Sequence, residues 1–122
     1  MVRIDRGEDY ITKAFEYAHE ADPNAILFYN DYNTERPEKR ERVYKLLKQL
    51  VDAKVPVNAV GLQGHWSIYE PTGKELNETI EKFSTLGLKV QITELDMSVY
   101  PWAECRGWAP PGAGERRPCW RA

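Results

Sequence analysis

Apolar residues recur at the three- and four-residue spacing of a helix in three stretches of the chain. These stretches cover residues 9–21, 38–54 and 74–86. Their apolar stripes comprise Ile11, Ala14, Phe15 and Ala18, then Val43, Leu46, Leu47, Leu50 and Val51, and finally Leu76, Ile80 and Phe83. We expect three amphipathic helices, each with one face packed inward and the other in solvent.

A short, continuous apolar run follows each predicted helix, at residues 25–29, 57–62 and 88–93. Runs of this length are typical of strands buried on both faces, as in parallel sheets. Gly87 precedes the third run and suits the left-handed position after a helix. Residues 30–37, after the first run, are predicted to form a polar loop.

The elements therefore alternate helix and strand three times, with strands starting at about residues 26, 57 and 88. This repeat predicts a parallel α/β sheet with right-handed crossovers, either doubly wound or part of a (β/α)8 barrel. No glycine-rich phosphate loop follows a strand, which argues against a nucleotide-binding, doubly wound sheet. Polar residues end all three strands and favour the barrel, whose active site lies at the carboxyl ends of its strands.

The character of the sequence changes at Pro101. Residues 102–122 have no helical or strand period and concentrate both cysteines and three of the four tryptophans. We expect one folded unit over residues 1–101 and an irregular or disordered tail over residues 102–122. An alternative origin of this tail is translation out of frame or of vector sequence, which yields a similar composition. Cys105 and Cys119 have no histidine nearby, which argues against a zinc site. A disulfide between the two cysteines stays an alternative.

Length and charge limit the classes of partner that the sequence suggests. The chain has 122 residues, the size of one domain, with 17 basic and 19 acidic side chains and a formal net charge of −2. This balance gives no electrostatic basis for binding nucleic acid or an anionic membrane. No apolar run approaches the roughly 20 residues that cross a bilayer. The charged start of the chain does not resemble a signal peptide, so a secretion signal would have to lie outside it.

Two carboxylates end the third apolar run. Glu94 and Asp96 lie two residues apart, and alternate residues of a strand share a face. A carboxylate at the mouth of a barrel strand can attack the anomeric carbon of a sugar or act as a general base. The alternative for Glu94 is a salt-bridged carboxylate at a strand end. Asp96 and the polar ends of the other strands favour the catalytic interpretation.

The second apolar run ends in polar residues that alternate onto one face. These residues are Gly61, Gln63 and His65. A histidine beside a Glu/Asp pair can orient a nucleophilic carboxylate and stabilise its charge, whereas an isolated histidine is more often structural. The amide of Gln63 can bond sugar hydroxyls or a carboxylate, or form an ordinary loop hydrogen bond.

The first run ends in Asn30-Asp31-Tyr32-Asn33, a dense polar and aromatic cluster. Tyr32 can stack on a sugar ring, and Asn33 and Asn30 can bind its hydroxyl groups. An asparagine-rich turn is the alternative, and we expect it to account for at least one asparagine. No metal-ligand spacing, nucleophilic serine or cysteine motif, or nucleotide fingerprint occurs, so neither a metal nor a cofactor is expected. Carboxylates, amides and aromatic rings suit carbohydrate chemistry.

Taken together, the three strand ends resemble glycoside hydrolase family 10, whose members are mostly endo-1,4-β-xylanases with a (β/α)8 barrel. The resemblance rests on Tyr29–Asn33, Gly61–His65 and Ile92–Asp96, in that order and spacing, and extends over roughly residues 5–100. It implies an α/β unit that forms part of a TIM barrel, with its parallel strands corresponding to about the fifth, sixth and seventh.

By this resemblance, Glu94 is the nucleophile of a retaining mechanism, and Asp96 holds the imidazole of His65 against it. The residues implied to contact the sugars on either side of the scissile bond are Gln63, Tyr32 and Asn33. The implied substrate is xylan or a xylo-oligosaccharide. The implied parent protein is secreted.

The sequence also departs from the family pattern. The general acid/base glutamate of the family ends the fourth strand in a Trp-Asp-Val-Val-Asn-Glu-like motif, which does not occur here. We therefore predict a fragment with nucleophile Glu94 and little or no turnover by itself. The alternatives are another retaining β-1,4-glycanase of the cellulase type, or an inactive truncated product that at most binds sugar. Open sheet edges would also favour self-association.

Overall fold

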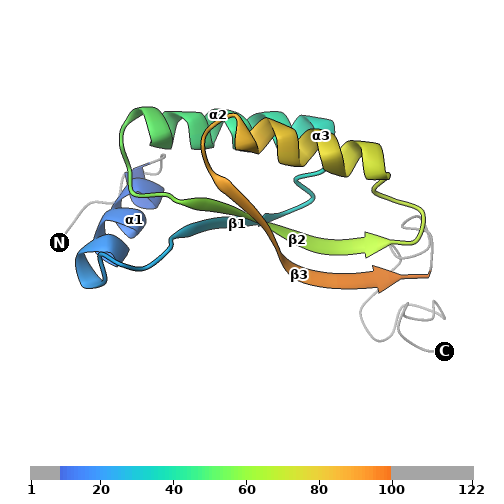
Figure 1. The fold of residues 1–122 in the computed structure, drawn as a ribbon, viewed down its shortest axis with the longest axis horizontal. Helices are drawn as coiled ribbons and strands as arrows, with labels where there is room; N and C mark the ends of the chain where they lie inside the picture. Colours follow the sequence, from blue (N-terminus) through green and yellow to red (C-terminus); the bar gives the residue numbers. More distant parts are fainter. Residues whose placement is uncertain (1–8, 100–122) are drawn as a thin grey trace, which may run out of the picture.

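The computed structural model describes residues 9–99 of the 122-residue chain. Helices and strands alternate along this part of the chain (Figure 1). Their bounds are α1 Asp9–Ala21, β1 Phe28–Tyr32, α2 Pro37–Asp52, β2 Ala59–Ser67, α3 Gly73–Ser84 and β3 Lys89–Ser98. The expected α/β repeat is confirmed. The predicted tail over residues 102–122, with Cys105 and Cys119, lies outside the described residues.

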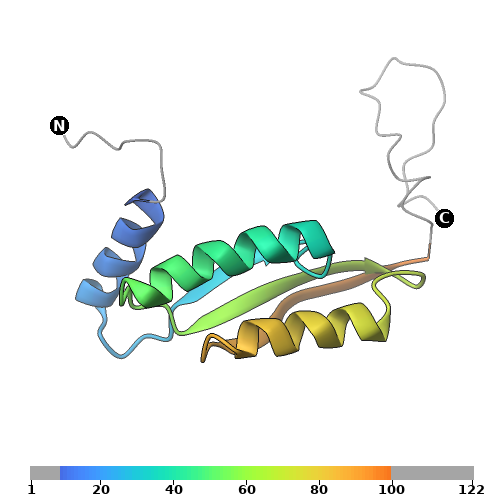
Figure 2. The same ribbon diagram turned by 90° about the horizontal axis from the view of Figure 1, so that it is seen from above.

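The three strands form one parallel sheet in the order β1-β2-β3, so β2 is the central strand. Helices α2 and α3 lie against the same face of the sheet, and α1 lies near the start of β1 (Figures 1 and 2). Within residues 9–99, no helix covers the opposite face. Because parallel strands end at the same edge, the polar ends of all three strands come together there.

The hydrophobic core lies between the helices and the sheet. Phe83 of α3 and Leu47 of α2 are fully buried, in one cluster with Val60 and Leu62 of β2. Phe15 joins α1 to this cluster. The helical stripes predicted from the sequence therefore point, for the most part, into a shared core.

The helices agree with the sequence prediction to within two residues at each end, but the strands do not. β1 begins at Phe28 and continues through Tyr32, so the loop predicted to start at residue 30 is wrong there. β2 and β3 likewise run on to Ser67 and Ser98. Backbone hydrogen bonds between neighbouring strands do not depend on side-chain polarity, so the ladder continues through the polar residues that follow each apolar run.

The two outer strands, β1 and β3, are not buried on both faces as the sequence predicts. In β3, Leu95 is 64% exposed and Met97 is 57% exposed. Ile80 of α3, which the helical stripe places inward, is also 37% exposed. Among the described residues β2 has a neighbour on each side, whereas β1 and β3 have one neighbour each, and this position explains the exposure of Leu95 and Met97.

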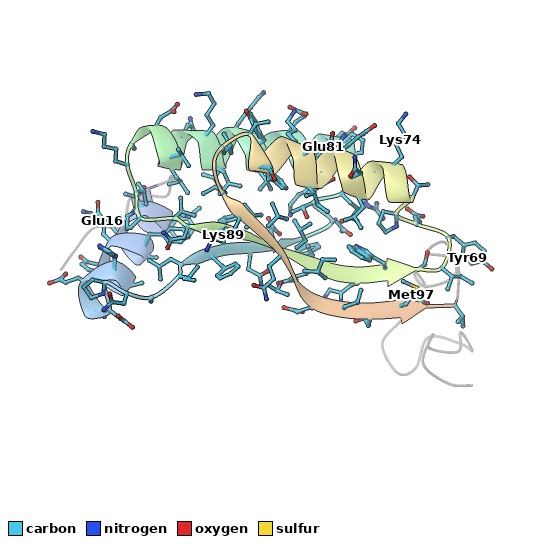
Figure 3. The ribbon with its side chains drawn as sticks, viewed as in Figure 1. Glu16, Tyr69, Lys74, Glu81, Lys89 and Met97 are labelled. Atoms are coloured by element: carbon cyan, nitrogen blue, oxygen red, sulfur yellow. The ribbon has the colours of Figure 1, made fainter. Side chains whose placement is uncertain are left out.

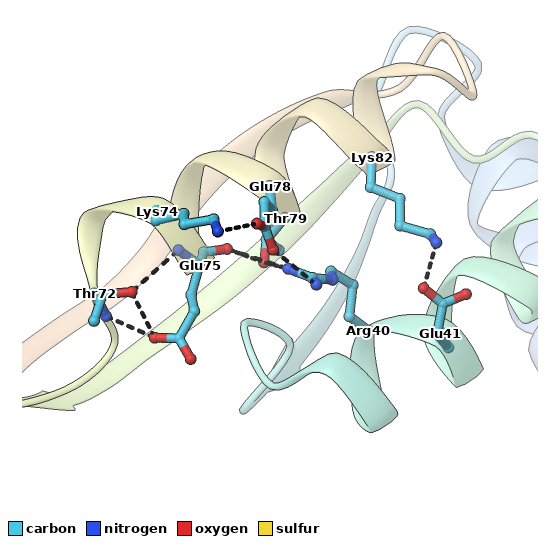
Figure 4. Close-up of polar contacts among 8 residues, drawn as sticks. All are labelled: Arg40, Glu41, Thr72, Lys74, Glu75, Glu78, Thr79 and Lys82. Atoms are coloured by element: carbon cyan, nitrogen blue, oxygen red, sulfur yellow. Dashed lines mark hydrogen bonds and ion pairs between the residues drawn. The ribbon is translucent and has the colours of Figure 1, made fainter.

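Helix α3 begins at a complete capping box. Thr72 Oγ1 accepts a hydrogen bond from the Glu75 N–H at 3.3 Å, and Glu75 Oε2 accepts one from the Thr72 N–H at 2.8 Å (Figure 4). Two backbone N–H groups that lack partners within the helix are thereby satisfied. Beyond the other end, Gly87 adopts a φ of +75°, the left-handed conformation predicted for it.

Arg40 links α2 to α3 through polar contacts between the two helices. Its Nη1 donates to the Glu75 carbonyl oxygen at 3.3 Å and to Thr79 Oγ1 at 3.2 Å (Figure 4). Its Nη2 donates to Glu78 Oε2 at 3.2 Å, and the Arg40 side chain is only 10% exposed. These contacts hold the two helices in register over the sheet face that they cover.

The outer surface of the helix layer is polar. Lys74 of α3 points away from the sheet, whereas Tyr69 and Met97 lie near the carboxyl end of the strands (Figure 3). None of the helices in residues 9–99 has both the length and the apolar character needed to cross a membrane.

Candidate active site

Alternate residues of β2 divide between the two faces of the sheet. Val60 and Leu62 are buried in the core beneath the helices. Gly61, Gln63 and His65 therefore lie on the other side, which we name the open face. The three strand-end positions singled out in the β2 sequence share this face, as predicted.

The register between β2 and β3 shifts by one residue in the middle of the strands. Leu62 pairs with Ile92, but the next residue, Gln63, pairs with Glu94. Thr93 is therefore an extra residue in β3, as in a β-bulge.

This shift decides which way the two carboxylates point. In an unbroken ladder Glu94 would pair with Gly64, on the side of the helices. With the extra residue, Glu94 pairs with Gln63, and Asp96 pairs with His65. Both carboxylates consequently lie on the open face. Bulges re-aim side chains in this manner and are frequent beside active sites.

His65 lies between the two carboxylates and contacts both. Its Nδ1 is 2.6 Å from Asp96 Oδ2, and its Nε2 is 2.9 Å from Glu94 Oε2. The structure thus brings together the three residues predicted to form the catalytic group. All three remain partly exposed among the described residues, with Asp96 the most exposed.

The neighbouring carboxylates raise the pKa of His65 above its ordinary value. The hydrogen bond with Asp96 is the largest cause, partial desolvation of the ring opposes the rise, and the charge of Asp96 and the contact with Glu94 add to it. A raised pKa favours the imidazolium, which can donate one N–H to each carboxylate. His65 can therefore orient both carboxylates and reduce the repulsion between them.

Gln63 and Tyr32 extend the open face from β2 to β1. The two residues pair in the register of the sheet, and Gln63 pairs with Glu94 on its other side. Tyr32 is 55% exposed, and Lys39 Nζ lies 4.4 Å from the centroid of its ring. This cation–π contact ties the Tyr32 ring to α2. An exposed aromatic ring and an amide on neighbouring strands are suited to contact with a sugar.

Asn30 also lies on the open face, but its amide oxygen is engaged by the protein. Thr93 Oγ1 donates to Asn30 Oδ1 at 2.6 Å, across Gly61 of the central strand. A Cβ atom at Gly61 would lie 2.4 Å from Asn30 Oδ1, so the contact requires glycine at that position. Sequence reasoning assigned Thr93 no role, because a hydroxyl in an apolar strand carries no signal of a partner two strands away.

Asn33 lies beyond the end of β1, in the turn that leads to α2. Its φ is +55°, and its carbonyl oxygen accepts a hydrogen bond from the Arg36 N–H at 3.2 Å. Asparagine tolerates this left-handed conformation better than most residues. The turn interpretation therefore applies to Asn33, and a contact of its side chain with sugar stays a prediction.

Asp31 points to the side of the sheet that carries the helices. Its carboxylate accepts hydrogen bonds from Tyr29 Oη at 3.1 Å and from Lys39 Nζ at 2.9 Å. Burial, followed by the charge and hydrogen bond of Asp31, raises the pKa of Tyr29 to about 12. Since Lys39 also lies over the Tyr32 ring, this network connects α2 to the aromatic side chain of the open face.

The open face offers a carboxylate held by an imidazole, an amide and an exposed aromatic ring. These groups suit nucleophilic or acid–base chemistry on a carbohydrate. Within residues 9–99, no three His, Cys, Asp or Glu side chains are placed to hold a metal ion together.

The sequence matches the profile of Glycosyl hydrolase family 10 over residues 3–111. Endo-1,4-beta-xylanase B of Paenibacillus barcinonensis is 51% identical to it over 94 residues, and beta-1,4-xylanase of Dictyoglomus thermophilum is 55% identical over 94 residues. Each alignment covers 77% of this chain, but only 28% and 27% of the respective relative. The chain therefore spans less than a third of the length of these curated relatives.

Solved structures show the same similarity. A GH10 xylanase of Thermobacillus composti has a TM-score of 0.77 at 49% identity, over 82% of this chain and 33% of that chain. A mutant protein in complex with xylotriose has a TM-score of 0.77 at 45% identity, over 84% of this chain and 32% of that chain. The expected partial (β/α)8 barrel is thus confirmed.

Proposed function

This chain belongs to glycosyl hydrolase family 10, and from that premise we propose that it carries the nucleophile of a retaining endo-1,4-β-xylanase. The contact of His65 with both Glu94 and Asp96 is the observation that supports this proposal most. The longer protein would hydrolyse internal β-1,4-xylosidic bonds of xylan. The names of the relatives, which are xylanases, support the choice of substrate.

Glu94 is the proposed nucleophile. Its carboxylate attacks the anomeric carbon, the bond to the leaving sugar breaks, and a covalent glycosyl-enzyme forms. His65 donates to Oε2 of Glu94, and no other residue within 9–99 hydrogen-bonds to that carboxylate. We assign the attack on the anomeric carbon to the other carboxylate oxygen. Asp96 fixes the orientation of the imidazole through its opposite nitrogen.

A general acid/base completes the cycle. It protonates the departing oxygen and then removes a proton from the water that releases the sugar from Glu94. Retaining glycosidases hold their two carboxyl groups about 5–5.5 Å apart. Asp96 is committed to His65. We therefore assign the acid/base to a carboxyl group outside the described residues.

The remaining residues of the open face would bind the sugars. Tyr32 supplies an exposed ring, and Gln63 lies opposite Glu94 in the strand register. Gln63 and Tyr32 would contact the sugars on either side of the cut, with Asn33 at the rim. A cellulase-type substrate is the alternative, and parallel assays on xylan and carboxymethylcellulose distinguish the two.

A chimera tests the proposed nucleophile. Residues 9–99 replace the corresponding segment of the Thermobacillus composti xylanase, to which this chain is 49% identical. We expect xylan hydrolysis with retained anomeric configuration by NMR. Glu94→Ala should lower kcat by a factor on the order of 10⁴ or more, as for other essential nucleophiles.

Rescue by azide tests whether the Glu94→Ala chimera is correctly folded and lacks only the nucleophile. With an activated aryl β-xylobioside, azide should restore turnover to the Glu94→Ala chimera and yield the α-glycosyl azide, because the small anion replaces the missing carboxylate. A first-formed product of inverted configuration, or full activity in Glu94→Ala, would contradict the assignment. Lys48→Ala, on the outer surface of α2, is the matched control expected to leave activity unchanged.

The 122-residue chain by itself is expected to release little or no reducing sugar from xylan. Its exposed apolar side chains support self-association, since Leu95, Met97 and Val99 of the β3 region are each more than half exposed. Sedimentation analysis over a range of concentrations tests this expectation. Secretion of the longer protein stays a proposal, and a signal peptide encoded upstream in the gene would support it.

A further inference from the structure

One polar contact on the open face spans the whole sheet. Thr93 of β3 donates to Asn30 of β1 at 2.6 Å, although β2 lies between these two strands. The Thr93 hydroxyl also lies 3.4 Å from the Leu62 carbonyl oxygen of β2. All three strands are therefore joined at the residue where the register shifts.

We propose that Asn30, Gly61 and Thr93 form a brace that positions Glu94 for nucleophilic attack. The proposal rests on the function proposed for Glu94. It makes these three positioning residues, and it assigns Asn30 a role other than the sugar contact predicted from the sequence.

Gly61 makes the brace sterically feasible. A Cβ atom there would lie 2.4 Å from Asn30 Oδ1 and 2.8 Å from Thr93 Cγ2, both closer than such atoms approach. Gly64 serves the opposite side of the same strand, where a Cβ atom would lie 2.9 Å from the Glu94 carbonyl oxygen. The two glycines therefore leave space on both faces of β2 for the shifted segment of β3.

The brace acts on Glu94 because Thr93 is the extra residue. If Thr93 returned to a regular ladder, Glu94 would pair with Gly64 and leave the open face. His65 would then lose its 2.9 Å contact with Glu94 and its 2.6 Å contact with Asp96. Holding the Thr93 hydroxyl on Asn30 thus favours the register in which both carboxylates meet His65.

Thr93→Val tests the brace, because it removes the hydroxyl and nearly conserves volume. Thr93→Ser is its matched control, since it keeps the hydroxyl. The first readout is the NMR titration of His65 in the 122-residue chain. In Thr93→Val we expect the pKa of His65 to fall towards its ordinary value, and in Thr93→Ser we expect it to stay raised. An equal response of the two variants would overturn the proposal.

The second readout is the kinetics of the same variants in the xylanase chimera. Without the hydroxyl, only a fraction of the molecules should keep Glu94 on the open face, so we expect Thr93→Val to lower kcat by about 10- to 100-fold with KM little changed. Thr93→Ser should recover most of the loss. An unchanged kcat in Thr93→Val would overturn the brace.

Gly61→Ala provides an independent test if Thr93→Val does not fold in the isolated chain. Its added methyl group separates Asn30 from Thr93 without removing either partner. In the chimera it should lower kcat as Thr93→Val does, and wild-type kcat in Gly61→Ala would contradict the proposal. The titration reports on the brace alone, whereas the Glu94→Ala assay reports on the proposed nucleophile, so each can fail without the other.

Discussion

The two faces of this sheet differ in chemistry although they are built from the same strand residues taken alternately. On the helix face, Val60 and Leu62 of β2 are essentially inaccessible to solvent and pack with Phe83. On the open face, Gln63 and His65 remain partly exposed, beside the carboxylates of β3. One strand therefore supplies both the core and the candidate site.

The difference between the faces indicates that stability resides mainly on the helix face and reactivity on the open face. Burial of apolar area stabilises the fold, and within residues 9–99 that burial is concentrated on the helix face. The open face contributes polar contacts between partly exposed groups, which stabilise little. Substitutions on the helix face should therefore change stability, and substitutions on the open face should change chemistry.

Phe83→Ala is expected to have the largest effect. Phe83 is fully buried in α3, and truncation of a buried phenylalanine costs roughly 3–5 kcal/mol of unfolding free energy. Gln63→Ala on the open face is the matched comparison and should change stability by no more than about 0.5 kcal/mol. Urea denaturation followed by circular dichroism measures both. Equal losses in the two variants would break the division between the faces.

Arg40→Met sharpens the comparison within the helix layer. It removes the guanidinium contacts with Glu78 and Thr79 but keeps an apolar stem, and loss of hydrogen bonds from a buried charged group costs about 1–3 kcal/mol. Lys48→Met is the control, because Lys48 forms an exposed pair with Asp52 along the outer face of α2. Such an exposed pair contributes little to stability, because water screens the two charges. A larger loss of unfolding free energy in Lys48→Met than in Arg40→Met would mean that burial does not determine how much each contact stabilises the fold.

The pH dependence of the open face should be the smallest effect on stability. His65 has a raised pKa in the folded chain, chiefly through its hydrogen bond with Asp96. Its stabilising contribution is therefore complete below the ordinary histidine pKa and is lost as the pH rises through the raised value. Asp96→Asn should lower the pKa of His65 in an NMR titration and flatten this part of the profile of Tm against pH. Phe83→Leu, on the helix face, should leave that titration unchanged.

Much of the fold could be predicted from the sequence, because it depends on local patterns. The apolar stripe that contains Phe83 defines α3, and Gly87 marks the turn after it. The βα repeat itself predicts parallel strands. The ends of the strands could not be predicted in the same way, since Tyr32 and Ser98 continue a backbone ladder that polarity does not reveal.

The candidate site, like the fold, could be predicted from the sequence only in part. The sequence places Glu94 and Asp96 on one face of a strand, and the motif around His65 links them to a family. It also allows two interpretations of Asn33, and the left-handed turn at that residue agrees with the structural one. Local patterns thus identify which residues belong to the strand ends, but they leave open what each side chain contacts.

The sequence by itself determined the order of elements, the amphipathic faces of the helices and the set of polar residues at the carboxyl ends of the strands. Only the tertiary structure decided that the two carboxylates face His65 and not the helices. The physical reason is the single extra residue, Thr93, because the period of a strand is two and a shift of one residue reverses every side chain beyond it. At that shift Thr93 meets Asn30 and Gly61, which are distant from it in sequence and adjacent to it only in the folded sheet.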